Sequence, residues 1–545
     1  MHRWFLVVCL AACALGRDPV RARNAMVVTQ EPNATDIGVK VLRSGGNAID
    51  AAVAVTFALA VTYPSAGNIG GGGFLLYRSR DGQSTFIDFR ERAPLKASRD
   101  MYLGPDGEPT SESREGWKAA GVPGTVAGLE LAHQKYGRKK WAELIAPSIQ
   151  LAAKGFEISY QQARGFRETS NRLSAFPESK RIFLRDGQFY EPGEKLIQPE
   201  LAKTLQRIQK SGSKDFYRGE TARILAEEME RNGGLITLED LKQYQAFERT
   251  PLKGSYKEFE VLTAPPPSSG GIGILQMFQV LNGSGYDKSG WGAASTIQFI
   301  AETMRRYYAD RAEFLGDPDF VKVPVDQLIS AAYANKRRST ILPNRATSST
   351  EIGPGSIPAT ESPQTTHFSI LDAEGNAVAL TYTINNGYGN SVTVPRLGFL
   401  LNNEMDDFSA KPGAPNIFGA VGGSANAIAP KKTPLSSMTP TILVQNGQPG
   451  IVIGAPGGTR IINGVFQVLL NLIDFKMNVQ DADRLYLENG FSPDTIELLK
   501  GMGYEIGPFS EGIANVQAIV VENGPTGRWL AGGWDGRGTG KAAGY

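Results

Sequence analysis

A run rich in Ser, Thr, Pro and Gly, residues 339–364, divides the chain into two parts. Such a composition buries little apolar surface, so we expect the run to be a mobile linker. Long structureless segments are uncommon in compact domains, and those that occur are functional or are linkers; one use is a segment that is cut. The part before the run has mainly helical patterns, and the part after it contains several strand patterns. The sequence therefore predicts an α+β protein whose two parts meet at residue 365.

Thr365 stands at the end of this run, and it has two interpretations. A threonine that becomes a new N-terminus carries nucleophile and base on one residue, because its hydroxyl attacks and its own α-amine takes the proton. An α-amine has an unperturbed pKa of about 7.7–8.0, so it is partly neutral near pH 7. In the other interpretation Thr365 is an ordinary strand residue, since threonine favours strands.

Composition excludes several classes of function. The 545 residues carry a net charge of +2, so no strong field favours nucleic acid as a partner. The three histidines, His2, His133 and His367, are too few for a histidine-built metal site. They also disfavour a Ser-His-Asp hydrolase, and no G-x-S-x-G motif is present. We therefore expect no metal, no cofactor and no nucleic-acid partner.

The first 16 residues have the basic start and short apolar core of a secretory signal. We therefore expect export to the periplasm or the cell exterior. The run that ends at Cys13 resembles a lipoprotein cleavage box, which would leave a lipid on Cys13; the alternative is ordinary cleavage near residues 14–16. No other stretch has the roughly 18 unbroken apolar residues of a membrane span, so a lipid anchor is the one membrane attachment that we expect.

Two groups of charged residues are candidates for binding a ligand. Arg90 is the last residue of a predicted strand over residues 84–90. It is either a solvated or ion-paired surface group or a group that binds a carboxylate, for which a guanidinium fork is suited. A short acidic segment could bind calcium or an ammonium group, although it lacks the EF-hand spacing; its acids are Glu404, Asp406 and Asp407.

Two glycine-rich turns are further candidates. Residues 67–73 could form an anion-binding nest, but we favour a tight turn that leads into a strand. Gly457 and Gly458 open a predicted helix over 461–475, and backbone amides at such a place are suited to stabilise an oxyanion. The alternative for this pair is a simple strand-to-helix turn.

Six blocks of sequence, in the same order, resemble the γ-glutamyltransferases, which belong to the N-terminal-nucleophile hydrolase superfamily. The resemblance extends over nearly all of residues 24–545. It implies a four-layer αββα sandwich that two chains of a self-cut precursor form jointly. The most specific blocks are residues 88–91, 265–271, 365–369, 402–408, 434–438 and 457–458.

The resemblance also implies how the precursor is cut. The Thr365 hydroxyl would attack the carbonyl of Gln364, and water would cleave the resulting ester. The products would be a large chain, residues 24–364, and a small catalytic chain, residues 365–545. The two would stay together as a heterodimer.

The same resemblance assigns roles to residues of this sequence. Thr365 would form a γ-glutamyl ester, and Thr383 would hydrogen-bond this nucleophile. Gly457 and Gly458 would supply the oxyanion amides. The α-carboxylate of the substrate would be bound by Arg90, Ser436 and Ser437, and its α-ammonium group by Asn385, Glu404 and Asp407. Because the substrate is zwitterionic at its α-carbon, it needs a cationic and an anionic clamp on opposite sides, so the acids fit an ammonium group better than calcium.

The implied activity is transfer of the γ-glutamyl group from glutathione-like donors to amino acids, peptides or water. One alternative is an acylase for glutaryl β-lactams such as cephalosporins, or an enzyme that processes poly-γ-glutamate. A glutaryl group lacks the α-ammonium, so Glu404 and Asp407 favour γ-glutamyl donors. A second alternative, an exported binding protein without catalysis, conflicts with the presence of Thr365, Thr383 and the glycine pair.

Glu404 and Phe418 stand at positions where members of the γ-glutamyltransferase family differ. Glu404 stands where some members carry glutamine, and both side chains accept a hydrogen bond from an ammonium group. Residues 411–432 resemble a lid loop, in which Phe418 stands where some members place a tyrosine. The preference for acceptors therefore stays open.

Overall fold

A computed structural model describes residues 17–352, 365–411, 413, 422–482, 492–506 and 514–545 and contains two seven-stranded sheets. Neighbouring strands in both sheets are antiparallel. The first sheet consists, in spatial order, of β1 (Val20–Ala22), β15 (Gly527–Trp534), β14 (Gln517–Gly524), β13 (Gln448–Gly454), β12 (Thr441–Gln445), β9 (Phe259–Thr263) and β8 (Leu252–Tyr256). The second consists of β16 (Lys541–Gly544), β2 (Met26–Thr29), β10 (Thr366–Leu371), β11 (Ala377–Thr383), β3 (Gly72–Arg78), β4 (Ser84–Asp88) and β7 (Phe247–Arg249).

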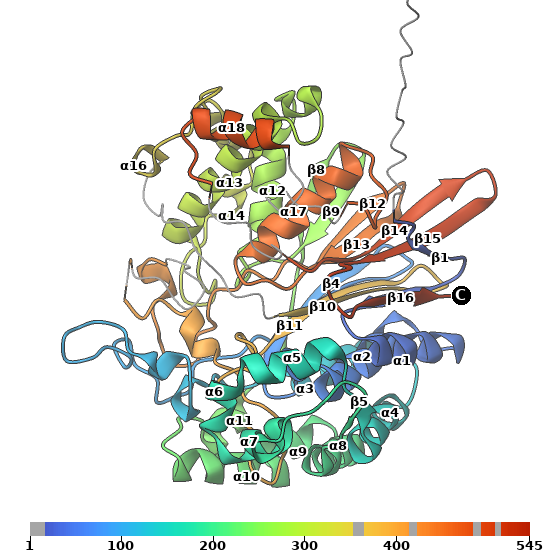
Figure 1. Ribbon diagram of the computed structural model, residues 1–545, viewed down its shortest axis with the longest axis vertical. Coiled ribbons are helices and arrows are strands. Elements are labelled where there is room, and N and C mark those ends of the chain that lie inside the picture. The colour runs from blue at the N-terminus through green and yellow to red at the C-terminus, as the bar shows by residue number, and fades with distance from the viewer. Residues whose placement is uncertain (1–16, 353–364, 412, 414–421, 483–491, 507–513) are drawn as a thin grey trace, which may run out of the picture.

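Helices cover the outer face of each sheet, which gives four layers (Figure 1). The layer on the second sheet contains α1 (Pro32–Arg43), α2 (Ala48–Thr62), α3 (Thr125–Tyr136), α4 (Trp141–Lys154), α5 (Tyr160–Glu168), α6 (Ser170–Ser174), α7 (Pro177–Leu184), α8 (Pro199–Ser211), α9 (Ser213–Arg218), α10 (Glu220–Arg231) and α11 (Leu238–Gln243). The layer on the first sheet contains α12 (Gly270–Leu281), α13 (Ala294–Phe314), α14 (Val325–Leu328), α15 (Ala331–Arg338), α16 (Ser349–Ile352), α17 (Arg460–Ile473) and α18 (Pro493–Gly501). A small pair, β5 (Phe156–Glu157) and β6 (Lys195–Leu196), lies within the first of these layers. The predicted αββα sandwich is confirmed.

Each sheet contains strands from both parts of the chain. In the second sheet β10 and β11 lie between β2 and β3. In the first sheet β12 pairs with β9, and β15 pairs with β1. Neither part could complete either sheet alone, so both parts form the fold jointly, as the sequence predicts.

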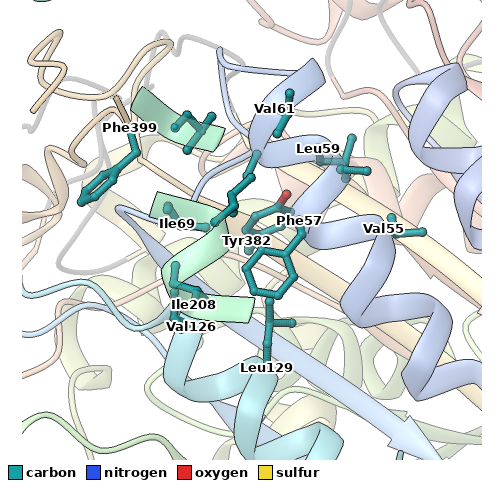
Figure 2. Packing of buried hydrophobic residues seen from close by; sticks show 14 of the residues in the cluster. Val55, Phe57, Leu59, Val61, Ile69, Val126, Leu129, Ile208, Tyr382 and Phe399 are labelled. Atoms are coloured by element: carbon teal, nitrogen blue, oxygen red, sulfur yellow. The ribbon is translucent and has the colours of Figure 1, made fainter. Parts of the chain in front are cut away.

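The central strands are buried on both faces. In β3, Leu75 packs in the core shared with the outer helices, whereas Phe74 and Leu76 pack in the core between the sheets. This alternation follows from the two-residue period of a strand. On the helix side, Tyr382 of β11 points toward α2, and its hydroxyl donates to the carbonyl of Thr56 at 3.1 Å (Figure 2). The result is a rigid support for the ends of β10 and β11.

The turn before β3 owes its glycines to close packing. A Cβ at Gly71 would lie 2.1 Å from the carbonyl oxygen of Thr383, and one at Gly70 would lie 2.2 Å from that of Leu400. Such distances are far below van der Waals contact, so a side chain cannot fit at either position. The structure confirms the tight turn that leads into a strand.

Several predicted elements differ from the observed ones. The sequence pattern of residues 256–263 is typical of one strand, but the segment contains the turn between β8 and β9, with Lys257 at φ +51°. The apolar residues 399–401 also predict a short strand, and this prediction is wrong, since the segment makes one isolated bridge, between Thr393 and Leu400. The glycine-rich tail contains a strand, β16, that the sequence analysis missed. Arg90 lies two residues beyond the end of β4 rather than at its last position.

The described part of the predicted linker, residues 339–352, is held against α13 rather than mobile. Arg306 of this helix donates to the hydroxyl of Thr340 at 2.7 Å and to its carbonyl at 2.6 Å. The Thr347 hydroxyl donates to Glu302 of the same helix. Residues 353–364, including Gln364, lie outside the described residues, as do the predicted signal with Cys13 and the lid position Phe418. Within the part of the chain that is described, no helix has the length and apolar character needed to cross a membrane.

Candidate active site

A cavity of about 40 Å³ lies where strands from both sheets end. It contains every residue that the sequence analysis singled out for catalysis or substrate binding except Gly457, which precedes Gly458 in the same turn. The residues brought together are Arg90, Thr365, Thr383, Asn385, Glu404, Asp407, Ser436, Ser437 and Gly458. They come from both parts of the chain, so the site depends on the shared fold.

Thr365 is placed by the pairing of β10 with β11. The register sets Thr366 opposite Tyr382, so Thr365 lies beside Thr383 at the end of the hairpin. The Thr365 hydroxyl donates to the Thr383 hydroxyl oxygen at 3.5 Å, and that oxygen accepts the amide of Asn385 at 2.8 Å. Thr365 is 6% exposed, so its hydroxyl is almost fully shielded from water.

His367 lies two residues beyond Thr365 and is the histidine closest to it in sequence. Its ring is buried and bonds the hydroxyls of Thr381 at 2.8 Å and Ser369 at 3.1 Å. Burial lowers the pKa of His367 to about 3. Such a weak base does not suit proton abstraction near pH 7, so His367 has a structural role in this arrangement.

Asn385 and the acidic segment are held by a network of asparagines. Asn385 has φ +72°, which asparagine tolerates better than most residues, and its side chain donates to the carbonyl of Asn403 at 2.9 Å. The Asn402 side chain accepts the amide of Glu404 at 2.9 Å and donates to the carbonyls of Gly70 and Gly121, each at 2.8 Å. These bonds fasten the short 3₁₀ helix η5 (Glu404–Asp407) to the turn before β3.

Arg90 makes direct ion pairs with the predicted ammonium ligands. Its guanidinium lies 2.5 Å from a carboxylate oxygen of Glu404 and 2.5 Å from one of Asp407. Both the Arg90 and Glu404 side chains are 1% exposed. Burial alone would lower the pKa of Arg90, but the charges of Glu404, Glu91 and Asp407 raise it above its ordinary value. The predicted cationic and anionic clamps are therefore in contact here, not on opposite sides of the cavity.

The third acid of the segment, Asp406, faces elsewhere. Its carboxylate accepts a hydrogen bond from Ser113 at 2.6 Å and lies 3.5 Å from Arg114. Because Asp406 faces away from the cavity that Glu404 and Asp407 line, the three acids do not converge on one point. The geometry thus favours the ammonium interpretation of Glu404 and Asp407 over a calcium site.

Glu91 is a buried acid to which the sequence analysis gave no role. It lies 3.6 Å from the Arg90 guanidinium, and neither of its carboxylate oxygens accepts a hydrogen bond from the described residues. Burial raises the pKa of Glu91 to about 7, against the attraction of Arg90, and burial also raises the pKa of Glu404. One guanidinium cannot neutralise three carboxylates, two of them buried, so the cluster carries a negative charge or holds a proton near pH 7.

The serine segment lies on another wall of the cavity. The amide and hydroxyl of Ser269 both donate to the carbonyl of Ser436, at 2.8 and 2.7 Å. The Ser436 hydroxyl accepts the amide of Met438 at 3.1 Å. These bonds hold residues 265–271 against residues 434–438, which are two of the six blocks that resemble the family.

Arg311 is a second arginine of the cavity, and the sequence analysis missed it. It comes from α13, is 6% exposed, and donates to the hydroxyls of Ser269 at 3.0 Å and Ser437 at 3.2 Å. No sequence signal distinguishes it, because it is one of several charged residues in a long helix.

The glycine pair forms the turn between β13 and α17. Gly458 has φ +56°, a left-handed conformation that favours glycine, and its carbonyl accepts the amide of Ile461 at 3.2 Å. The turn is thus the start of α17, where unpaired backbone amides favour negative charge. This geometry suits an oxyanion hole beside Thr365.

A family model described as gamma-glutamyltranspeptidase matches residues 34–545. The glutathione hydrolase proenzyme of Escherichia coli (strain K12) is 48% identical over 523 residues, which cover 93% of this chain and 90% of that protein. Among solved structures, a cephalosporin acylase from Bacillus halodurans has a TM-score of 0.84 at 27% identity, with 97% of both chains covered. Helicobacter pylori gamma-glutamyltranspeptidase has a TM-score of 0.59 at 47% identity, covering 60% of this chain and 94% of that one.

Proposed function

Because the chain belongs to the gamma-glutamyltranspeptidase family, we propose that it is a γ-glutamyltransferase and glutathione hydrolase that cuts itself before Thr365. The observation that carries this proposal is the position of Thr365 in one cavity with Thr383, Gly458 and the Arg90 cluster. The cavity combines a shielded hydroxyl, a glycine turn suited to an oxyanion, and charged groups of both signs.

The first reaction is the cut between Gln364 and Thr365. The Thr365 hydroxyl attacks the Gln364 carbonyl, its C–N bond breaks as the ester forms, and water then releases the two chains. The products are residues 24–364, extending to the end of the linker, and residues 365–545. They remain a heterodimer, because β10 and β11 lie between β2 and β3 in one sheet.

The second reaction uses the amine that the cut exposes. This amine takes the proton of the Thr365 hydroxyl, which attacks the γ-carbonyl of the donor. Thr383 holds the hydroxyl in place, and the amides of Gly457 and Gly458 stabilise the oxyanion. Each such donor typically contributes about 10²–10³ in rate. The donor's amine leaves, and the γ-glutamyl ester then passes to an amino acid, a peptide or water.

Donor binding exchanges the ion pairs that Arg90 makes with Glu404 and Asp407. These pairs are direct, so a donor that contacts these groups has to break them. The ammonium group of the donor takes Glu404 and Asp407 as partners, with Asn385 beside them. Arg90 is thereby released to contact the donor's carboxylate, with Ser436 and Ser437.

The acylase is the alternative that a specific observation favours, since the cephalosporin acylase structure covers 97% of this chain. A glutaryl group has no ammonium group to pair with Glu404 and Asp407. Binding it would leave these acids, 1% and 16% exposed, dependent on Arg90 alone. The acids thus support γ-glutamyl donors.

A direct comparison of two donors tests the proposal. We expect the mature protein to hydrolyse a γ-glutamyl anilide faster than the matching glutaryl anilide, and glycylglycine to accelerate anilide release. The measurement is the initial rate with each donor, with and without this acceptor. Faster turnover of the glutaryl donor would refute the transferase assignment and favour the acylase. If neither donor is turned over, a non-catalytic protein is favoured.

We further propose that the protein is exported. The basic start and apolar core of residues 1–16 support this, and Cys13 is suited to carry a lipid. Mass determination of the N-terminal peptide from cells distinguishes a lipidated Cys13 from cleavage near residues 14–16.

A further inference from the structure

A second cavity, of about 440 Å³, lies apart from the active site, and no described residue lines both. Four basic side chains and a single acid, Asp240, are among the described residues that line it. The basic ones are Arg92, Arg218, Lys242 and Lys431. The surplus of positive charge is larger than the net charge of +2 on the whole chain, so the cavity concentrates positive charge.

The carboxylate of Asp240 is already engaged by neutral groups. One of its oxygens accepts the amide of Leu95 at 2.6 Å, and the other accepts the amide and the hydroxyl of Thr237 at 2.8 and 2.5 Å. Among the described residues, no ion pair joins Asp240 to a basic side chain of the cavity. Its charge offsets one of the four cations and leaves the others uncompensated.

Arg92 is held against two aromatic rings. Its guanidinium carbon lies 4.3 Å from the ring centre of Phe247 and 5.3 Å from that of Tyr244, and both rings line the cavity. The nearby Asp319 pairs with Arg249 at 2.7 Å, which lowers the pKa of this acid, with a smaller contribution from Arg92. Within the described residues the Arg92 side chain donates no hydrogen bond, so its N–H groups are free to bind an oxyanion.

Lys431 comes from the other part of the chain and is fastened beside the segment that follows Arg92. Its amide donates to the carbonyl of Ala93 at 2.9 Å, and the amide of Ala93 donates to the carbonyl of Lys432 at 2.9 Å. Lys431 makes no ion pair with a described carboxylate. The fold thus fixes two unpaired cations at one wall of the cavity.

The remaining two cations lie at the end of α11. Arg218 donates to the carbonyl of Lys242 at 3.3 Å, and Lys242 has one exposed acidic neighbour, Glu239, at 3.8 Å. Positive charges gathered in this way repel one another, and an anion bound among them removes the repulsion.

We propose that this cavity binds a small molecule that carries several oxyanion groups, such as a polycarboxylate or a polyphosphate. The volume lies within the roughly 300–1,000 Å³ of small-molecule sites, and a guanidinium is suited to two-pronged binding of carboxylate or phosphate. The bound molecule would lie close to the active site without entering it. Tyr244, which lines the cavity, donates through its hydroxyl to the carbonyl of Arg90 at 2.8 Å.

Isothermal titration calorimetry at low salt tests the site, with citrate and tripolyphosphate as probes for the two chemistries. We expect at least one of them to bind the wild-type protein. Arg92→Gln should weaken this binding roughly 10- to 100-fold, the effect of losing one hydrogen bond between charged groups. The double variant Lys242→Gln, Lys431→Gln should weaken it roughly 2- to 30-fold, the effect of losing two exposed charge pairs.

A matched pair of lysines controls for non-specific attraction. Lys203 and Lys210 of α8 are exposed, as Lys242 and Lys431 are, and lie outside the cavity lining. The double variant Lys203→Gln, Lys210→Gln removes the same charge and should bind the probe within about twofold of the wild type. If Arg92→Gln does not fold, the two lysine pairs decide the test, because their side chains are exposed.

Weaker binding confined to the variants of the cavity supports the proposal. Equal weakening in both lysine pairs, or no binding of either probe to the wild type, overturns it. Binding that excess L-glutamate abolishes would place the probe in the active-site cavity, and binding of phosphatidylglycerol vesicles without either probe would indicate a membrane surface; each also overturns it. Calorimetry measures binding without donor turnover, so the comparison of variants does not depend on the proposed function.

Discussion

Thr365→Ala should leave the protein as one uncut chain that turns over no γ-glutamyl donor. The substitution removes the hydroxyl that makes the attack in both reactions, and no described side chain of the cavity offers a replacement nucleophile with a base beside it. His367 cannot take over as the base, because burial lowers its pKa to about 3. Removing the nucleophile of a hydrolase costs on the order of 10⁶ in rate. Denaturing electrophoresis and an anilide assay measure the two effects.

Two matched variants control for this experiment. Thr365→Ser keeps a hydroxyl and the future α-amine, so it should be cut and retain part of the activity. Thr366→Val changes the neighbouring residue of β10, whose buried hydroxyl has no partner among the described residues, and it should be cut normally. A Thr365→Ala protein that still separates into two chains would refute the self-cleavage mechanism.

Arg90→Ala should weaken both the fold and donor binding. It leaves Glu91, Glu404 and Asp407 without their cation in a buried site, and breaking a buried pair in this way typically costs about 3–5 kcal/mol. Glu91 and Glu404, whose pKa burial already raises, would respond by holding protons near pH 7, since loss of the Arg90 charge, which lowers the pKa of both, raises their pKa further. Protonated acids bind an ammonium group poorly, so KM for γ-glutamyl donors should rise at least roughly tenfold.

The thermal unfolding midpoint and KM, measured on the same preparation, check this prediction. Arg90→Lys serves as the conservative variant, because it restores one positive charge without the two-pronged geometry. It should recover part of the stability and less of the affinity. An unchanged KM in Arg90→Ala would remove Arg90 from the site.

Much of the fold could be predicted from local pattern. The break at Gly45 to Asn47 separates α1 from α2, and the alternation on both sides of residues 373–376 predicts the β10–β11 hairpin. The site residues could also be identified, because most of them lie in the turns and strand ends of the resembling blocks. Antiparallel pairing then brings Thr383 beside Thr365.

Other features depend on partners that are distant in sequence. Strand β16 has a weak pattern of its own and exists because β2 pairs with it. Arg311 and Glu91 acquire their significance from burial beside Ser437 and Arg90, which no local pattern reveals. The contact between Arg90 and the acids likewise forms only in the tertiary structure, since Arg90 and Asp407 lie more than 300 residues apart in the sequence.

The central claim is that Thr365 carries the γ-glutamyl group during turnover. Its most direct test is mass spectrometry of the mature protein, quenched with acid while it consumes a γ-glutamyl donor. The mechanism predicts a small chain that begins at Thr365 and gains the mass of one γ-glutamyl group, with fragmentation placing the group on that residue. A small chain that never gains this mass, or a γ-glutamyl group found on another residue, would contradict it.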